Sequence, residues 1–172
     1  ITLGVALASS MGILGGGLHV VMHAMGKITL FMCAGSIYVA THRTEISQMT
    51  GLGRRMPITF IAFLIGALSI IGLPPLGGSW SKWLLMVGAV DAEHLFILGV
   101  LLVSSLLNVA YLLPLVAKGF FLSNETDSEL AQSAEASPLV WGPPAATAFG
   151  CVMLFFYAGH IQDFLMPIVA TN

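Results

Sequence analysis

Three ionisable side chains recur at intervals of four residues inside an apolar stretch that runs from residue 18 to residue 40. They are His19, His23 and Lys27. In an α-helix, four residues rise about 6 Å and turn about 40° beyond one full turn, so all three side chains project from a similar face. Each ionisable group in a membrane helix costs about 2.5 to 3.5 kcal/mol on insertion scales. We therefore expect this stripe to line an ion or proton path.

A fourth ionisable residue, Lys82, lies just after an interruption in the apolar stretch from residue 57 to residue 90. The interruption contains two adjacent prolines, which lack backbone N–H groups, so a helix must break or kink there. We expect one discontinuous span, and a short helical hairpin is the alternative. The residues expected at the break are Pro74, Pro75, Gly77 and Gly78. Broken helices at membrane depth often carry ion sites, which favours a functional Lys82 over one whose long stem reaches the membrane interface.

The amino-acid composition places these segments in a lipid bilayer. Of the 172 residues, 57% are hydrophobic and 8% are charged, whereas about 25% of residues are charged in soluble domains. A net charge of −2 and the lack of a long basic run exclude a nucleic-acid-binding footprint. The length is enough for about five spans of about 20 residues each. We expect an all-α, polytopic transmembrane helical bundle of about five spans, one of them discontinuous.

The apolar segments predict where the spans lie. A first, truncated span covers residues 1–14 and ends at the glycine run 15–17, and the span that carries the stripe ends near Thr41. A further span at residues 95–121 carries a small polar set, whose members are Ser104, Ser105, Asn108 and Tyr111. A last span runs from about residue 139 to residue 157 and is followed by a polar tail.

Charged residues are distributed unevenly between loops and spans. Every acidic residue falls in a loop or tail, and several lie in an acidic loop at residues 122–138, whereas Lys27 and Lys82 fall within apolar segments. A buried ammonium group needs a counter-charge or loses its proton. We expect the carboxylates to come from further sequence or from another subunit. Because the chain begins at Ile1 within an apolar run, we also expect it to be part of a longer protein.

Two other interpretations of the histidines remain open. A single histidine in a membrane helix often bonds to a group on a neighbouring helix and is then structural. Two histidines four residues apart can also ligate one zinc ion. No third ligand and no glutamate general base lies beside His19 and His23 in the sequence, so we expect no metal site.

Several spaced motifs resemble those of one membrane-protein family. They occur in the order His19-Val-Val-Met-His23-Ala-Met-Gly-Lys27, Gly51-Leu-Gly-Arg-Arg-Met-Pro57, Gly66-Ala-Leu-Ser-Ile-Ile-Gly-Leu-Pro-Pro75 and Gly78-Ser-Trp-Ser-Lys82-Trp83. They resemble the antiporter-like proton-conducting subunits, which are shared by respiratory complex I, membrane-bound hydrogenases and Mrp-type sodium/proton antiporters. The triplet at residues 81–83, together with residues 101–111, most resembles the D subunit of the Mrp antiporters.

The resemblance implies an organisation and a set of roles. Family members contain two inverted helix repeats, each with a broken helix, and the chain resembles the second repeat plus a trailing helix. Residues 1–121 would form the second half of the transporter domain, 122–138 the acidic loop, and 139–172 the C-terminal helix and tail. The protonatable axis would include His19, His23, Lys27 and Lys82, with Ser81, Ser104 and Asn108 as polar lining. The pair Ser79-Trp80 departs from the family pattern, which puts water access at the site in doubt.

We expect a proton-translocating subunit of a multisubunit cation/proton antiporter, which relays protons through buried lysine and histidine side chains. It would carry no redox or hydrolytic site and no cofactor. The first alternative is the equivalent proton-pumping subunit of a complex I-type NADH:quinone oxidoreductase or a membrane-bound hydrogenase. The second is a structural membrane subunit. Expected partners are other membrane subunits, the lipid bilayer, and H⁺ with Na⁺ as a further candidate ion. The expected location is the bacterial inner membrane.

Overall fold

The protein is built from α-helices in a computed structural model that describes residues 1–121, 135 and 137–170. The described part contains no strand, which confirms the expected all-α class. In chain order the elements are α1 (Thr2–Ala6), α2 (Ser10–Thr41), the 3-10 helix η1 (Ile46–Met49), α3 (Leu52–Arg55), α4 (Pro57–Ile71), α5 (Gly78–Asp91), α6 (Leu95–Phe121) and α8 (Pro138–Ala170).

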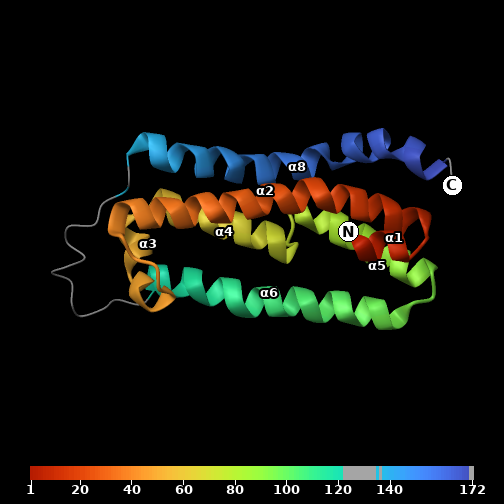
Figure 1. The fold of residues 1–172 in the computed structure, drawn as a ribbon, viewed down its shortest axis with the longest axis horizontal. Coiled ribbons are helices and arrows are strands. Elements are labelled where there is room, and N and C mark those ends of the chain that lie inside the picture. The colour runs from red at the N-terminus through yellow and green to blue at the C-terminus, as the bar shows by residue number, and fades with distance from the viewer. Residues whose placement is uncertain (122–134, 136, 171–172) are drawn as a thin grey trace.

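The long helices run side by side as a bundle (Figure 1). Helix α2 packs against α8 on one side and against α4 and α5 on the other, while α6 packs against α4 and α5. Three of the described helices, α2, α6 and α8, are long and apolar enough to cross a membrane. Helices α4 and α5 follow one another along α2 (Figure 1), so together they form the expected discontinuous helix.

The glycine run near the N-terminus lies inside a helix and does not end a span, contrary to our expectation. Helix α2 begins at Ser10, and the side chain of Ser9 caps it by accepting a hydrogen bond from the Gly12 N–H at 3.1 Å. The missing side chains at the run let α5 approach closely, because a Cβ atom at Gly15 would lie 2.8 Å from the backbone nitrogen of Leu85. Small residues commonly serve this purpose where membrane helices meet.

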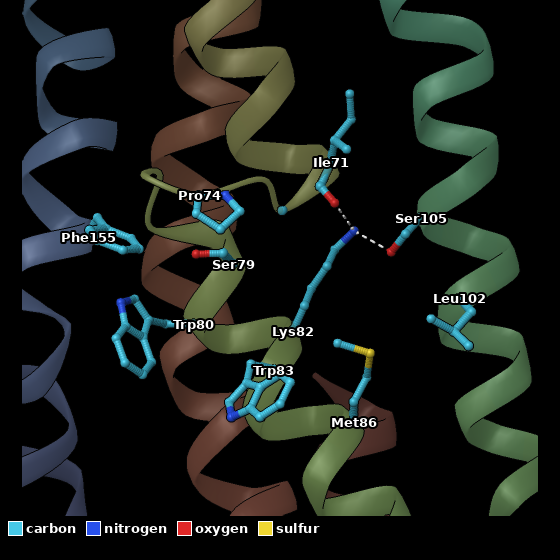
Figure 2. Close-up of a pocket in the computed structure, with 11 residues that line it drawn as sticks. Ile71, Pro74, Ser79, Trp80, Lys82, Trp83, Met86, Leu102, Ser105 and Phe155 are labelled. Carbon is cyan, nitrogen blue, oxygen red and sulfur yellow. Dashed lines mark hydrogen bonds between the residues drawn. The ribbon is translucent and has the colours of Figure 1, made fainter.

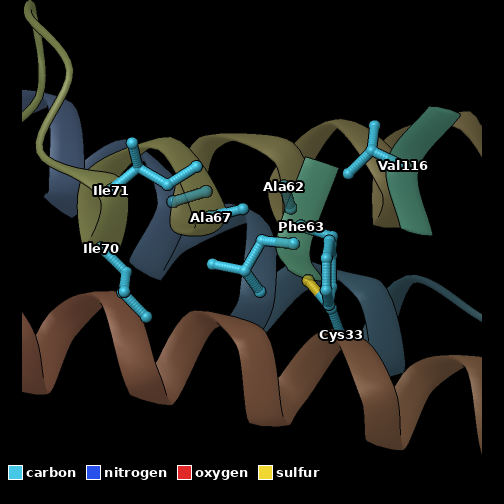
Figure 3. Close-up of a cluster of buried hydrophobic side chains, with 9 residues drawn as sticks. Cys33, Ala62, Phe63, Ala67, Ile70, Ile71 and Val116 are labelled. Atoms are coloured by element: carbon cyan, nitrogen blue, oxygen red, sulfur yellow. The ribbon is translucent and has the colours of Figure 1, made fainter. Parts of the chain in front are cut away.

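A cluster of buried apolar side chains joins α2, α4, α6 and α8 (Figure 3). Helix α4 supplies most of it, and its members are Cys33, Ala62, Phe63, Ala67, Ile70, Ile71, Leu112, Val116 and Ala148. Interiors packed in this way resist displacement of their helices, because gaps and overlaps both cost free energy. The cluster therefore fixes the first half of the broken helix against its neighbours.

The break itself follows from local sequence. Helix α4 starts at Pro57, where a missing N–H costs nothing. It ends at Ile71 and is capped by Gly72, whose φ of 88° lies in the left-handed region that favours glycine. The chain then makes a turn at residues 73–77, with a cis bond between Pro74 and Pro75, before α5 begins at Gly78. The expected discontinuous span is confirmed, and the hairpin alternative is wrong.

The last helix is longer than expected. Helix α8 continues to Ala170, well past residue 157, so His160, Gln162 and Asp163 lie within the helix and not in a tail. Most of the predicted acidic loop, residues 122–134 and 136, lies outside the described residues. Glu135 is described, and its carboxylate accepts hydrogen bonds from the Thr59 hydroxyl and the Ile58 N–H at the start of α4.

The start of α5 is packed too tightly to accept a side chain. A Cβ atom at Gly78 would lie 1.8 Å from the carbonyl oxygen of Ser69, so Gly78→Ala must displace backbone. We expect this variant to lose about 1 to 3 kcal/mol of stability, as in other overpacked sites, and to unfold at a lower temperature in detergent. Gly99→Ala is the control, because no atom lies within 4 Å of its added Cβ. Equal thermal stability of the two variants would contradict the packing described here.

Candidate functional site

A polar cavity of about 340 Å³ lies between α2, α5 and α6. The ionisable and polar side chains that line it are His19, His23, Lys27, Lys82, Ser104, Ser105, Asn108 and Tyr111. The structure therefore brings the stripe on α2 together with the lysine beyond the break and with the polar set on α6. Of the seven predicted relay and lining residues, only Ser81 does not line this cavity directly.

The two histidines form a stacked pair at one side of the polar cavity. Their ring centroids are 5.1 Å apart and their planes differ by 24°. Both rings are half-buried. Their spacing of four residues places them one helical turn apart on the same face of α2, which brings the rings together. Stacked imidazoles at this separation offer neighbouring nitrogen atoms that can each bind a proton.

Ser81 is fully buried and fixes the orientation of His19. The Ser81 hydroxyl donates to the carbonyl of Gly78 at 3.1 Å, and its oxygen lies 2.9 Å from His19 Nδ1. A hydroxyl has a single hydrogen, so we assign Nδ1–H of His19 as the donor to Ser81 Oγ. This tautomer leaves Nε2 of His19 as a proton acceptor.

Lys82 is held by the broken helix and by α6 (Figure 2). Its ammonium group donates to the carbonyl oxygen of Ile71 at 3.0 Å and to Ser105 Oγ at 2.9 Å. Ile71 is the last residue of α4, and the C-terminus of a helix carries partial negative charge that stabilises a cation. The break therefore supplies Lys82 with an acceptor that an unbroken helix would have used internally.

Sequence reasoning missed the Ile71 carbonyl as a partner of Lys82. We expected carboxylates to balance the buried lysines, and no acidic side chain is among the described residues that line the polar cavity. Gly72 could have indicated this partner, because a glycine that ends a helix is preceded by carbonyl groups without a partner inside the helix. Ser105 had been recognised as polar, but its contact with Lys82 depends on how α6 packs.

Lys27 differs from the other members of the stripe in being exposed. It lies on the polar cavity beyond His23, so the ionisable groups on α2 pass from half-buried to exposed along the helix. Asn108 and Tyr111 lie on the facing helix, where the Tyr111 hydroxyl donates to Asn108 Oδ1 at 2.9 Å. Lys27 and Tyr111 are both exposed, so the polar cavity reaches the surface of the described residues here.

A second, mostly apolar cavity of about 540 Å³ lies on the other side of Lys82 (Figure 2). We call it the tryptophan cavity, and its lining includes Trp80, Trp83, Met86, Leu102, Phe155 and Pro74. Trp80, whose place near the site raised doubt about water access, lines this cavity and not the polar one. Pro74 and Pro75 are exposed in the turn, whereas Gly77 and Gly78 are buried.

The site is suited to moving protons between fixed groups. Two lysines and two histidines share one cavity with hydroxyl and amide groups that can hold water. In the described part of the chain, no three His, Cys, Asp or Glu side chains are grouped closely enough to hold a metal ion. Fold and site together define an integral membrane protein in which a broken helix carries a lysine beside a row of ionisable residues.

Comparison with known proteins gives the family. A family model described as the transmembrane region of NADH:quinone oxidoreductase/Mrp antiporter matches residues 1–108. The chain therefore belongs to this family of antiporter-like membrane subunits. NADH-quinone oxidoreductase subunit N of Desulforudis audaxviator is 38% identical over 120 residues, which cover 70% of the chain and 24% of that protein. The chain thus spans about a quarter of this curated relative.

Solved structures confirm the fold. The Mrp complex from Dietzia sp. contains a chain with a TM-score of 0.85 and 21% identity, matched over 97% of this chain and 39% of that one. Respiratory complex I from Thermus thermophilus with bound NADH gives a TM-score of 0.82 and 24% identity, with 97% and 34% coverage. These matches do not separate the Mrp branch from the complex I branch.

The polar cavity predicts where water reaches the bundle. In the full protein, Asn108→Cys should react with methyl methanethiosulfonate, because a thiol forms its reactive thiolate where water is accessible. Leu112→Cys lies on the same helix but is buried, so it should react much more slowly. Within this chain the native Cys33 and Cys151 are buried and should contribute little background labelling, which the protein without the added cysteine measures. Similar slow labelling of both variants would contradict a hydrated cavity.

Proposed function

We propose that this chain is the proton-translocating part of a membrane subunit in a multisubunit cation/proton antiporter. The observation that carries the proposal is the convergence of His19, His23, Lys27 and Lys82 on one polar cavity beside a broken helix. Broken helices with exposed backbone ends are used by transporters to bind ions near the middle of the bilayer. Its partners would be other membrane subunits, H⁺ and Na⁺, and its location would be the bacterial inner membrane.

Lys82 has partners that suit both its charged and its neutral form. As an ammonium group it donates to the Ile71 carbonyl and to Ser105 Oγ, and its third N–H has no acceptor among the described residues. That hydrogen is the one available to water in the cavity. After the proton leaves, the amine nitrogen can accept a hydrogen bond from the Ser105 hydroxyl, which is free to rotate.

The histidines would connect the two lysines. Each imidazole ring has two nitrogen atoms, so it can accept a proton on one and donate a proton from the other. His19 Nε2 is the acceptor left by the bond to Ser81, and the stacked His23 lies between His19 and Lys27 on the same helix. Protons would pass through these groups and intervening water, driven by charge changes in neighbouring subunits.

A second candidate is supported by the sequence comparison. The 38% identity to NADH-quinone oxidoreductase subunit N favours a subunit of a complex I-type enzyme, which would use the same relay but be driven by redox chemistry elsewhere in the complex. Exchange assays in vesicles distinguish the two: the antiporter moves protons in response to a Na⁺ gradient without an electron donor. Co-purification with dehydrogenase or hydrogenase subunits would favour the redox complex.

Replacing Lys82 tests the relay directly. Lys82→Met in the complete complex should reduce cation-coupled proton exchange by about tenfold or more, because methionine cannot carry a proton. The lost ammonium group also makes two charge-assisted hydrogen bonds at the break. The matched control is Lys118→Met, whose lysine is exposed at the end of α6. Exchange is measured with a pH-sensitive dye in vesicles. Normal exchange in an assembled Lys82→Met complex would remove this residue from the mechanism.

The histidines should partly replace one another. His19→Gln and His23→Gln are each expected to lower exchange only moderately, whereas the double variant should lower it far more, because neighbouring stacked rings can share the proton. His94→Gln is the control, since His94 is exposed in the turn after α5. Exchange is measured in the same vesicles across a range of pH. A double variant with the full rate and an unchanged pH profile would show that the histidines only pack.

A further inference from the structure

We propose that helix α8 acts as a positioning element for the ion site, through a contact with the turn of the broken helix at Gly77. This inference rests on the proposed function, because its consequence is the placement of Lys82. Helix α8 lies outside residues 1–108, the segment matched by the family model. The contacts that α8 makes with the turn and with α5 support this role.

One backbone hydrogen bond ties the turn to α8. The N–H groups of Gly72, Leu73 and Leu76 bond within α4 or the turn itself. The N–H of Gly77 instead donates to the carbonyl oxygen of Cys151 on α8, at 3.1 Å. The two prolines cannot donate, so this bond is what fixes the end of the turn to a neighbouring helix.

Close packing strengthens the same contact. A Cβ atom at Gly77 would lie 2.9 Å from the Leu154 Cβ atom and 3.4 Å from Met22 Cγ. The turn is thus wedged between α8 and α2 and has no room for a side chain. An added methyl group would have to push the turn away from α8, because Cβ of Leu154 cannot rotate aside.

A second contact lies at the start of α5. The rings of Trp80 and Phe155 are 6.0 Å apart between centroids and inclined by 42°. Phe155 and Pro74 both line the tryptophan cavity, on the side opposite Leu102 of α6 (Figure 2). Helix α8 therefore contacts both the turn and the first residues of the helix that carries Lys82.

Helix α8 is in turn held against the helix that carries the histidines. Thr29 Oγ1 donates to the Met25 carbonyl at 2.8 Å and lies 3.7 Å from Cys151 Sγ, so the thiol of Cys151 is the donor in that contact. The Ser36 hydroxyl lies 3.0 Å from the carbonyl oxygens of both Met32 and Val140, so its one hydrogen is shared between an acceptor on α2 and one on α8. The same residue, Cys151, thus joins the turn to α2 through its carbonyl and thiol groups.

These contacts affect the site because the turn joins the end of α4, where Ile71 lies, to the start of α5, which carries Lys82. A shift of the turn changes the distance between the Ile71 carbonyl and the Lys82 ammonium group, now 3.0 Å. Hydrogen bonds weaken steeply as their geometry departs from the optimum. Loosening or displacing the turn should therefore alter transport without altering any ionisable residue.

The test uses the complete complex in vesicles, with proton exchange followed across a range of pH. Gly77→Ala should lower exchange by about tenfold and displace its pH profile, since it disturbs a charge-assisted hydrogen bond. Adding Leu154→Gly, which removes the Cβ atom that the new methyl group would strike, should restore much of the rate. Leu154→Gly alone is measured beside it. Gly159→Ala is the control, because no atom lies within 4 Å of its added Cβ on α8.

An assembled Gly77→Ala complex with the normal rate and pH profile would overturn the inference, as would a double variant no better than Gly77→Ala. If Gly77→Ala fails to assemble, Phe155→Leu tests the inference in its place. This variant keeps an apolar side chain but loses the ring contact with Trp80. An unchanged pH profile in Phe155→Leu would overturn the inference. Loss of exchange in Lys82→Met with normal exchange in Gly77→Ala refutes only the role of α8. Normal exchange in Lys82→Met refutes the proposed function instead.

Discussion

The bond between the Lys82 ammonium group and the Ile71 carbonyl depends on the helix being broken, and much of the structure serves that break. A continuous helix would consume the Ile71 carbonyl internally, whereas here it faces a cation at 3.0 Å. The broken pair α4 and α5 keeps its place because α2 packs along both halves and α6 packs along their other side. The buried cluster around α4 and the contacts of α8 with the turn hold the two ends in register.

Helix α2 combines two requirements that compete for the same sequence. Its glycines allow α5 to approach closely, as Gly15 does at Leu85, while its ionisable stripe faces the polar cavity. Ionisable groups in a membrane are tolerated where they face protein or water and not lipid. The close approach of α5 brings Ser81 to His19, so the packing of glycines and the orientation of an imidazole have one cause.

Lys82 separates two environments of opposite character. On one side lies the polar cavity with the histidines, and on the other lies the tryptophan cavity with Trp80 and Trp83. A low-dielectric wall strengthens electrostatic interactions within the adjacent polar space. The apolar side therefore makes the charge state of Lys82 more sensitive to the groups that share the polar cavity.

The sequence by itself determined the all-helical membrane class, the common face of His19, His23 and Lys27, and the break at Pro74 and Pro75. Each follows from local properties: composition, helical periodicity and missing N–H groups. Only the tertiary structure decided that the glycine run lies inside α2, that α8 continues to Ala170, and that Ser105 and the Ile71 carbonyl bind Lys82. These depend on which faces of distant helices meet, because a contact between residues far apart in the chain leaves no trace in local spacing.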